Sequence, residues 1–215
     1  MTTVTQPASI DATSSTNLRT AGRWCLVAGV IGAIQAAVIL AWPHQVPEAR
    51  FSFPFTATGH VIAQSTFFLQ HLPLLVAVVS LARLPRVRDS KATRIGLTVA
   101  AAGLGLLALM EIVAMAGATT AAKSHLGSLL GGLYGLPMLL IGAGLTVAGA
   151  ALLRNGALRA ISWFLAVLGV WLFVVMTPAL ASGSFIAGRI AIGAWMLLFA
   201  GLGLSMMRSG RAVRP

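Results

Sequence analysis

The sequence predicts an all-α protein, a polytopic bundle of six transmembrane helices with the N and C termini in the cytoplasm. Three observations lead to this fold class. Hydrophobic residues make up 58% of the chain and charged residues only 9%, whereas soluble domains carry about 45–50% and about 25%. Six apolar stretches are each long enough to cross a hydrocarbon core of about 30 Å. Basic residues gather between alternate stretches. This composition excludes a soluble enzyme domain, a disordered chain and a coiled coil.

The six predicted spans are residues 24–42, 59–82, 95–117, 128–153, 160–180 and 186–207. Backbone polar groups in lipid must be hydrogen-bonded internally, and these stretches lack the alternation of barrel strands, so each is expected to be a helix. Together they form one transmembrane domain over residues 21–208. Residues 1–20, rich in Ser and Thr, are expected to be a disordered cytoplasmic tail. Residues 209–215 are expected to be a short basic cytoplasmic tail.

The first span is predicted to be a retained helix rather than a cleaved signal peptide. Its polar leader is long, and its apolar run is longer than the roughly 7–15 residues of a signal peptide. The run also ends in Leu40-Ala41-Trp42-Pro43, which is a poor cleavage site.

The basic residues fix the predicted orientation. Twelve of the 15 lie at one set of span ends: Arg19, Arg23, Arg83, Arg86, Arg88, Lys91, Arg94, Arg154, Arg159, Arg208, Arg211 and Arg214. The opposite ends carry Arg50, Lys123 and Arg189. Cytoplasmic loops carry the excess of Lys and Arg, so both termini are predicted to be cytoplasmic. The net charge of +11 is therefore explained by the excess of basic residues at the predicted cytoplasmic ends of the spans. The expected partner is the lipid bilayer, and nucleic acid is not expected.

Prolines and glycines within the spans give expectations about packing. Pro73 and Pro137 lie in the middle of the second and fourth spans, and each is expected to kink its helix. On the fourth span, Gly127, Gly131 and Gly135 follow one another at four-residue steps, and Gly132, Gly142, Gly144 and Gly149 add to them. Such a face lets a neighbouring backbone approach closely, and we expect it to pack within the chain in preference to forming a homodimer.

The longest connection on the predicted outer side is residues 43–58. It contains the alternating residues Phe51, Phe53 and Phe55. Alternation places three rings on one side of an extended segment. We expect a strand-like stretch that lies on the headgroup region or caps the bundle, with plain interfacial anchoring as the alternative.

Polar residues inside the spans are the candidates for function, because ionisable groups in a membrane are costly and usually face the bundle interior. Glu111 is the only acidic residue within a span. At about 1.5 Å per residue it lies about 9 Å below the outer end of its helix, and Gln35 and Gln64 lie at about 10 Å and about 8 Å. Arg189 lies about one turn inside the sixth span. These four residues are expected to share one layer in the outer half of the membrane.

The second span adds a polar stripe. His60, Gln64 and His71 are separated by steps that return to the same helical face. His60 and His71 are three turns apart, so they cannot bind one ion together, and His44 and His125 lie in loops. No metal site, haem or other cofactor is expected. No catalytic motif is present either, because the chain contains neither a nucleophile elbow nor a phosphate-binding loop.

Three functions remain open on this basis. The sequence favours a non-enzymatic accessory or structural membrane bundle, alone, as a homo-oligomer or with other membrane subunits. The second is a small transporter or proton-coupled carrier, with an outer-half pocket around Glu111 and the His60, Gln64 and His71 stripe. The third is a membrane enzyme that acts on a lipid or quinone-like substrate, with His60 or His71 as a base. The bias toward Arg, Ala and Gly indicates a bacterial inner (plasma) membrane, crossed several times.

Overall fold

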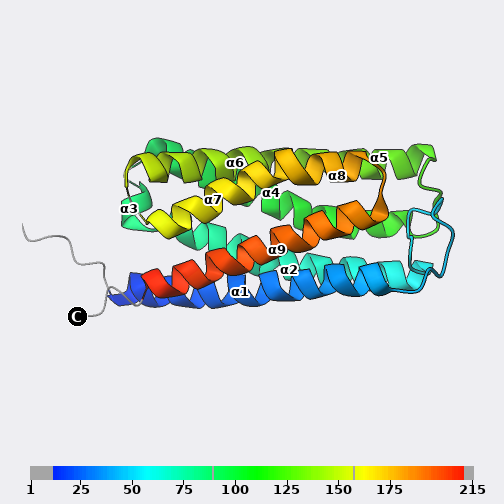
Figure 1. Cartoon of the computed structure of the whole chain (residues 1–215), viewed down its shortest axis with the longest axis horizontal. Helices are drawn as coiled ribbons and strands as arrows, with labels where there is room; N and C mark the ends of the chain where they lie inside the picture. Colours follow the sequence, from blue (N-terminus) through cyan, green and yellow to red (C-terminus); the bar gives the residue numbers. More distant parts are fainter. Residues whose placement is uncertain (1–11, 89, 157, 211–215) are drawn as a thin grey trace, which may run out of the picture.

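The computed structural model describes residues 12–88, 90–156 and 158–210, and these form a bundle of helices along one long axis (Figure 1). The elements are α1 (Ala12–Ala41), α2 (Ala57–Ala82), α3 (Pro85–Arg88), α4 (Lys91–Ala114), a 3-10 turn (Met115–Gly117), α5 (His125–Leu133), α6 (Gly135–Arg154), α7 (Arg159–Trp171), a π-turn (Leu172–Met176), α8 (Thr177–Ala181) and α9 (Phe185–Ser209). Within the described residues they make six segments that are long and apolar enough to cross a membrane. The predicted six-helix fold class is therefore confirmed.

The bundle has two ends of different character. The start of α1 and the end of α9 lie at the left of Figure 1, together with the connections that follow α2 and α6. We call this part the termini half. The loop of residues 42–56 lies at the right with the connections that precede α5 and α9, and we call this part the loop half. That the loop half faces away from the cytoplasm stays a prediction from the basic residues.

The six spans close into a ring. Each span packs against the next one along the chain, in the order α1, α2, α4, α6, α7 and α9, and α9 packs against α1. Two tryptophans join the neighbouring helices α7 and α9: Trp171 donates its indole N–H to the carbonyl of Ala191 at 3.1 Å, and Trp195 donates to that of Leu168 at 3.2 Å. A closed ring of helices can fill its centre with side chains or enclose a cavity, and the two halves differ in this respect.

Glycines close the ring in the termini half and at mid-span. A Cβ atom added to Gly22 would lie 2.8 Å from the carbonyl oxygen of Gly203. One added to Gly144 would lie 2.5 Å from that of Gly96. Since membrane helices associate through close van der Waals contact, these pairs bring α1 against α9 and α4 against α6. The space between the helices is filled by fully buried side chains such as Leu97.

The predicted glycine face of the fourth span is wrong in its first part and confirmed in its second. A Cβ atom on Gly131 or Gly135 would meet no atom within 4 Å, and the atoms nearest to one on Gly127 belong to Ala121 and Ala122, just before its own helix. The close contacts with neighbouring helices come from the glycines of α6, namely Gly142, Gly144 and Gly149. The physical reason is that α5 borders an open space, whereas α6 lies between α4 and α7.

The two predicted proline kinks turn out differently. Helix α2 runs without interruption through Pro73. The fourth span breaks at Tyr134, between α5 and α6. Pro137 has no N–H to donate to the carbonyl of Leu133, and its ring opposes that carbonyl, so α5 ends there. A third proline, which the sequence reading did not single out, is Pro178: it follows the π-turn, whose Leu172 carbonyl accepts a 2.7 Å hydrogen bond from the Thr177 hydroxyl.

The loop of residues 42–56 caps the loop half, but not as a strand. Residues 51–54 form turns, and in this part of the described chain the only ladder pairing is an isolated bridge between Arg50 and Ala121. Arg50 also donates to the carbonyl of Thr119 at 2.7 Å. The loop is thus tied to the connection before α5, a long-range contact that alternation alone cannot predict.

The first helix begins earlier than the sequence indicates. Helix α1 starts at Ala12, so residues 12–20 are helical rather than part of a disordered tail. Leu18 on this extension is buried against the core, which accounts for the added turns. Residues 1–11 and 211–215, the rest of the two predicted tails, lie outside the described residues.

Candidate functional site

A cavity of about 470 Å³ lies inside the ring in the loop half. Its walls come from α1, α2, α4, α5, α6, the π-turn, α8 and α9, and the loop of residues 42–56 covers it. The six polar residues that the sequence indicates all line it: Gln35, His60, Gln64, His71, Glu111 and Arg189. The structure thus brings together side chains from four spans, while their role in binding or proton handling stays a prediction.

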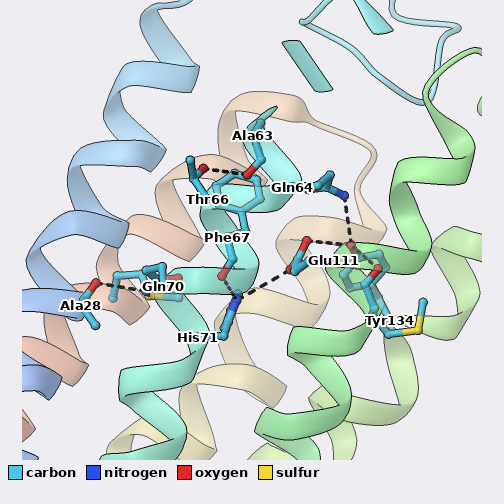
Figure 2. Close-up of polar contacts among 11 residues, drawn as sticks. Ala28, Ala63, Gln64, Thr66, Phe67, Gln70, His71, Glu111 and Tyr134 are labelled. Carbon is cyan, nitrogen blue, oxygen red and sulfur yellow. Dashed lines mark hydrogen bonds and ion pairs between the residues drawn. The ribbon is translucent and has the colours of Figure 1, made fainter. Parts of the chain in front are cut away.

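Glu111 and Tyr134 form the centre of the polar wall (Figure 2). The Tyr134 hydroxyl donates to Oε2 of Glu111 at 2.9 Å and accepts from Nε2 of Gln64 at 3.3 Å. Glu111 on α4 is only 6% exposed and points inward. Because Tyr134 stands at the break between α5 and α6, the Pro137 break places this hydroxyl against the carboxyl group.

His71 lies beside this network. Its Nδ1 is 2.7 Å from the carbonyl oxygen of Phe67, one turn earlier on α2, and 3.9 Å from Oε1 of Glu111 (Figure 2). A carbonyl can only accept, so Nδ1 carries the proton and donates it to Phe67. The separation from Glu111 is too long for a hydrogen bond but within ion-pair distance. His71 is 5% exposed, so the pair lies in the bundle interior.

His60 has a different role from His71. Its Nε2 donates to the carbonyl of Ala114 at 3.1 Å, at the point where α4 passes into the 3-10 turn. Its ring packs edge-on against Phe51 at 5.7 Å between centroids. His60 therefore satisfies a helix end and supports the capping loop, which is a structural contribution to the cavity wall.

Gln35 and Arg189 are polar residues of the cavity that lack hydrogen-bond partners among the described residues. The Oε1 atom of Gln35 is buried without a hydrogen bond. Arg189 makes no ion pair within 4.0 Å and no hydrogen bond in this part of the chain. Its guanidinium carbon lies 5.3 Å from the centre of the Phe185 ring, which is a cation–π contact. Its charge and that of Glu111 act on each other across a longer distance.

Two polar residues of the site were missed from the sequence. Gln70 donates from Nε2 to the carbonyl of Ala28 on α1 at 3.0 Å and also contacts the sulfur of Met196. Gly32 makes room for it, since a Cβ atom there would lie 2.7 Å from the same nitrogen. The missed signals were simple: Gln70 stands next to His71, and Tyr134 is the only tyrosine of the chain.

The remaining walls are apolar. Phe51, Phe53 and Phe55 reach the cavity from the loop, and aliphatic, methionine and aromatic side chains line it from the helices. Ligand pockets in proteins commonly measure about 300–1,000 Å³ and combine apolar walls with a few converging polar groups. The cavity has this composition: a hydrogen-bonded polar group from α2, α4 and Tyr134, with Gln35 on α1 and Arg189 on α9 as further polar residues.

Two further findings bear on the site. Among residues 12–88, 90–156 and 158–210, no three His, Cys, Asp or Glu side chains come close enough together to hold a metal ion. Comparisons of the chain with protein-family models, curated protein sequences and solved structures returned no match. The function is therefore argued from the cavity and its chemistry.

Proposed function

We propose that this multi-pass membrane protein binds a small amphipathic molecule in the cavity of its loop half. One observation carries the proposal: Gln64, Tyr134, Glu111 and His71 converge on one side of a space of about 470 Å³ whose lining is mainly apolar. Apolar walls favour a hydrocarbon or ring system, and converging donors and acceptors favour a polar group on the same molecule.

The alternative is that these polar residues only hold the helices together, as in an accessory or structural bundle. Interhelical hydrogen bonds serve that purpose when the residues bond to one another and the space between them is filled. Here Gln35 keeps an unpaired buried oxygen and Arg189 has no hydrogen-bond or ion-pair partner among the described residues. Unused polar groups beside a large cavity support binding over packing.

A proton-coupled carrier is the second candidate, and the Glu111–His71 pair favours it. The two groups lie 3.9 Å apart in the cavity wall, so a charged ligand bound beside them would shift the balance of the proton between them. Intramembrane acid and histidine pairs of this type are used in proton relays. An enzyme acting on a lipid or quinone-like substrate has less support, because the described lining includes no serine, threonine or cysteine nucleophile.

We further propose that the protein resides in the inner (plasma) membrane of a bacterium, with the loop half on the extracytoplasmic side. The twelve-to-three division of basic residues supports this orientation. The bias toward Arg, Ala and Gly supports a bacterial source. Association with other membrane subunits or with a second copy is compatible with this proposal and is not required by it.

Photolabelling of the full chain tests the proposal. The protein is placed in phosphatidylcholine nanodiscs and irradiated with diazirine derivatives of dodecanol and dodecanoic acid. We expect at least one probe to label cavity residues such as Phe67, Met138 or Met196, and an excess of the unmodified compound to suppress that labelling. Labelling confined to lipid-facing residues such as Val174, without competition, would show that the cavity does not bind these amphiphiles and would overturn the proposal.

A further inference from the structure

The polar groups of the cavity are not equally satisfied. Gln64, Gln70 and Tyr134 each donate to an acceptor within the chain. The guanidinium of Arg189 has no acceptor among the described residues, although its fork of N–H donors is the largest in the cavity. Arginine stays protonated at any physiological pH, so this group is a permanent cation.

The surroundings of Arg189 hold the cation in place without neutralising it. The guanidinium carbon lies 5.3 Å from the centre of the Phe185 ring, and Phe185 itself packs edge-on against Phe53 at 5.0 Å and His44 at 6.3 Å. A cation–π contact uses none of the N–H donors of the guanidinium in a hydrogen bond, so they stay available. Charged side chains in membrane spans otherwise pair with an opposite charge or face a water-filled cavity. Arg189 is therefore a preset cation beside an unfilled space.

Glu111 is the only carboxylate in the described cavity lining, and it is already engaged. Its Oε2 accepts from Tyr134, and it lies beyond 4.0 Å from Arg189. An anionic ligand group would be repelled by an ionised Glu111 and attracted by Arg189. The two charges thus orient an anion toward the end of the cavity that the loop of residues 42–56 covers.

We infer that the ligand is an anionic amphiphile, whose carboxylate or phosphate group binds Arg189 and whose apolar part occupies the rest of the cavity. This inference rests on the proposed function and names its ligand class. Guanidinium groups bind both anions through two parallel charge-assisted hydrogen bonds.

The position of Gly131 supports an amphiphile over a small soluble anion. Gly131 lines the cavity, yet it is exposed, and a Cβ atom there would meet nothing within 4 Å. The cavity therefore reaches the outer surface of the bundle along α5, which belongs to a membrane-spanning segment. A molecule dissolved in the lipid reaches Arg189 by this route without crossing the capping loop.

Competition between ligands of equal chain length tests the inference. Cavity labelling by the neutral diazirine dodecanol is measured in phosphatidylcholine nanodiscs, with dodecanoate, dodecyl phosphate, dodecanol or dodecylamine as competitor. Both anions are expected to compete at concentrations about tenfold or more below dodecanol, the difference that charged hydrogen bonds of this type produce. Dodecylamine is expected to be the weakest. Acetate and inorganic phosphate separate the chain-bearing ligands from free anions and should not compete.

Two variants of one helix assign the preference. Arg189→Gln is expected to remove the advantage of the anions over dodecanol while dodecanol still competes. Arg208→Gln removes the same charge from the opposite end of α9, where Arg208 is exposed, and should keep the advantage. Arg189→Lys keeps the positive charge but lacks the planar guanidinium, so it should retain only part of the advantage of the anions over dodecanol. This variant also tests the preference if Arg189→Gln does not fold.

The outcomes separate this inference from the proposed function. Equal competition by anions and dodecanol in the parent protein would overturn the anion preference and leave cavity binding intact. An equal loss for all ligands in Arg189→Gln would assign Arg189 a structural role and also overturn it. Competition by acetate or phosphate as strong as by the long-chain anions would show a simple anion site. If neither dodecanol nor any anion affects cavity labelling, the proposed function itself fails.

Discussion

The termini half and the loop half of the bundle meet the same lipid but are built differently. In the termini half the helices are regular and approach closely, as at Gly22 with Gly203 and at Gly96 with Gly144. In the loop half three spans depart from the α-helix, at the 3-10 turn after α4, at Tyr134 and at the π-turn before α8. The cavity lies in that half.

This difference follows from the hydrogen bonds that regular and irregular backbone require inside a membrane. Irregular backbone inside a membrane is tolerated only where it is buried in protein or lines a cavity, because lipid offers no hydrogen bonds. Local π and 3-10 segments frequently mark functional sites. Two of the irregular positions, Tyr134 and Met176, contribute side chains to the cavity wall. The termini half is closely packed, and the loop half encloses the cavity.

The largest expected effect concerns which side of the membrane each half faces. Reporters fused after Arg154, in the termini half, are expected to be active as cytoplasmic fusions, and reporters inserted near Ala122, in the loop half, as external ones. The measurement is a paired assay with one reporter active only inside the cell and one active only outside. A cytoplasmic signal from the insertion near Ala122 would reverse the orientation assigned to the two halves.

The second-largest effect concerns stability, and it distinguishes the closely packed glycines of the bundle from those that border open space. Gly144→Leu is expected to destabilise the protein by about 3 kcal/mol or more, since overpacking against backbone is costly and a Cβ atom there already lies 2.5 Å from the Gly96 carbonyl. Gly131→Leu on the same span meets open space, so its melting temperature in detergent should match that of the parent. Equal melting of both variants would remove the distinction between a packed and an open half.

A third prediction concerns the polar wall. Glu111→Leu leaves the Tyr134 hydroxyl without its 2.9 Å acceptor and is expected to cost about 1–3 kcal/mol of folding free energy. Glu111→Gln keeps an acceptor oxygen and should lose clearly less. Thermal unfolding of purified protein measures both. A Glu111→Leu protein that melts like the parent would mean that the wall contributes nothing to folding.

Glu111→Gln also separates simple binding from proton coupling. If the Glu111–His71 pair carries protons, ligand uptake into vesicles should lose its dependence on a pH gradient in this variant while the fold is kept. Uptake that keeps the same dependence would exclude the carrier candidate and leave the binding proposal untouched.

The smallest effect is expected for Tyr134→Phe, which removes one hydroxyl from the same network. It should cost about 0.5–1.5 kcal/mol, the net value of an ordinary hydrogen bond. Ser65→Ala is the matched control, because Ser65 bonds only to the Val61 carbonyl of its own helix, and its change should stay within about 0.5 kcal/mol. Equal losses in the two variants would mean that Tyr134 has no special place in the wall.

The sequence predicts the spans well because lipid imposes length and hydropathy on each helix separately. It also indicates which polar residues reach the cavity, since Gln64 and His71 share one face of a regular helix. It is harder to predict which face of a helix packs against a neighbouring helix. Spacing alone made Gly131 a packing residue, although α5 has open space on that side. The turns of the capping loop depend on its pairing with Ala121, far along the chain.

The central claim, that the loop half binds an amphiphile in its cavity, is tested most directly by filling the cavity from one wall. Leu107 lines it and is 4% exposed, whereas Leu109 on the same helix is 56% exposed and points away. Labelling of cavity residues by diazirine dodecanol or dodecanoate is compared in Leu107→Trp and Leu109→Trp. We predict that labelling falls about tenfold or more in Leu107→Trp and is unchanged in Leu109→Trp, a size that corresponds to roughly 1.4 kcal/mol of binding free energy. Equal labelling in both folded variants would contradict the claim.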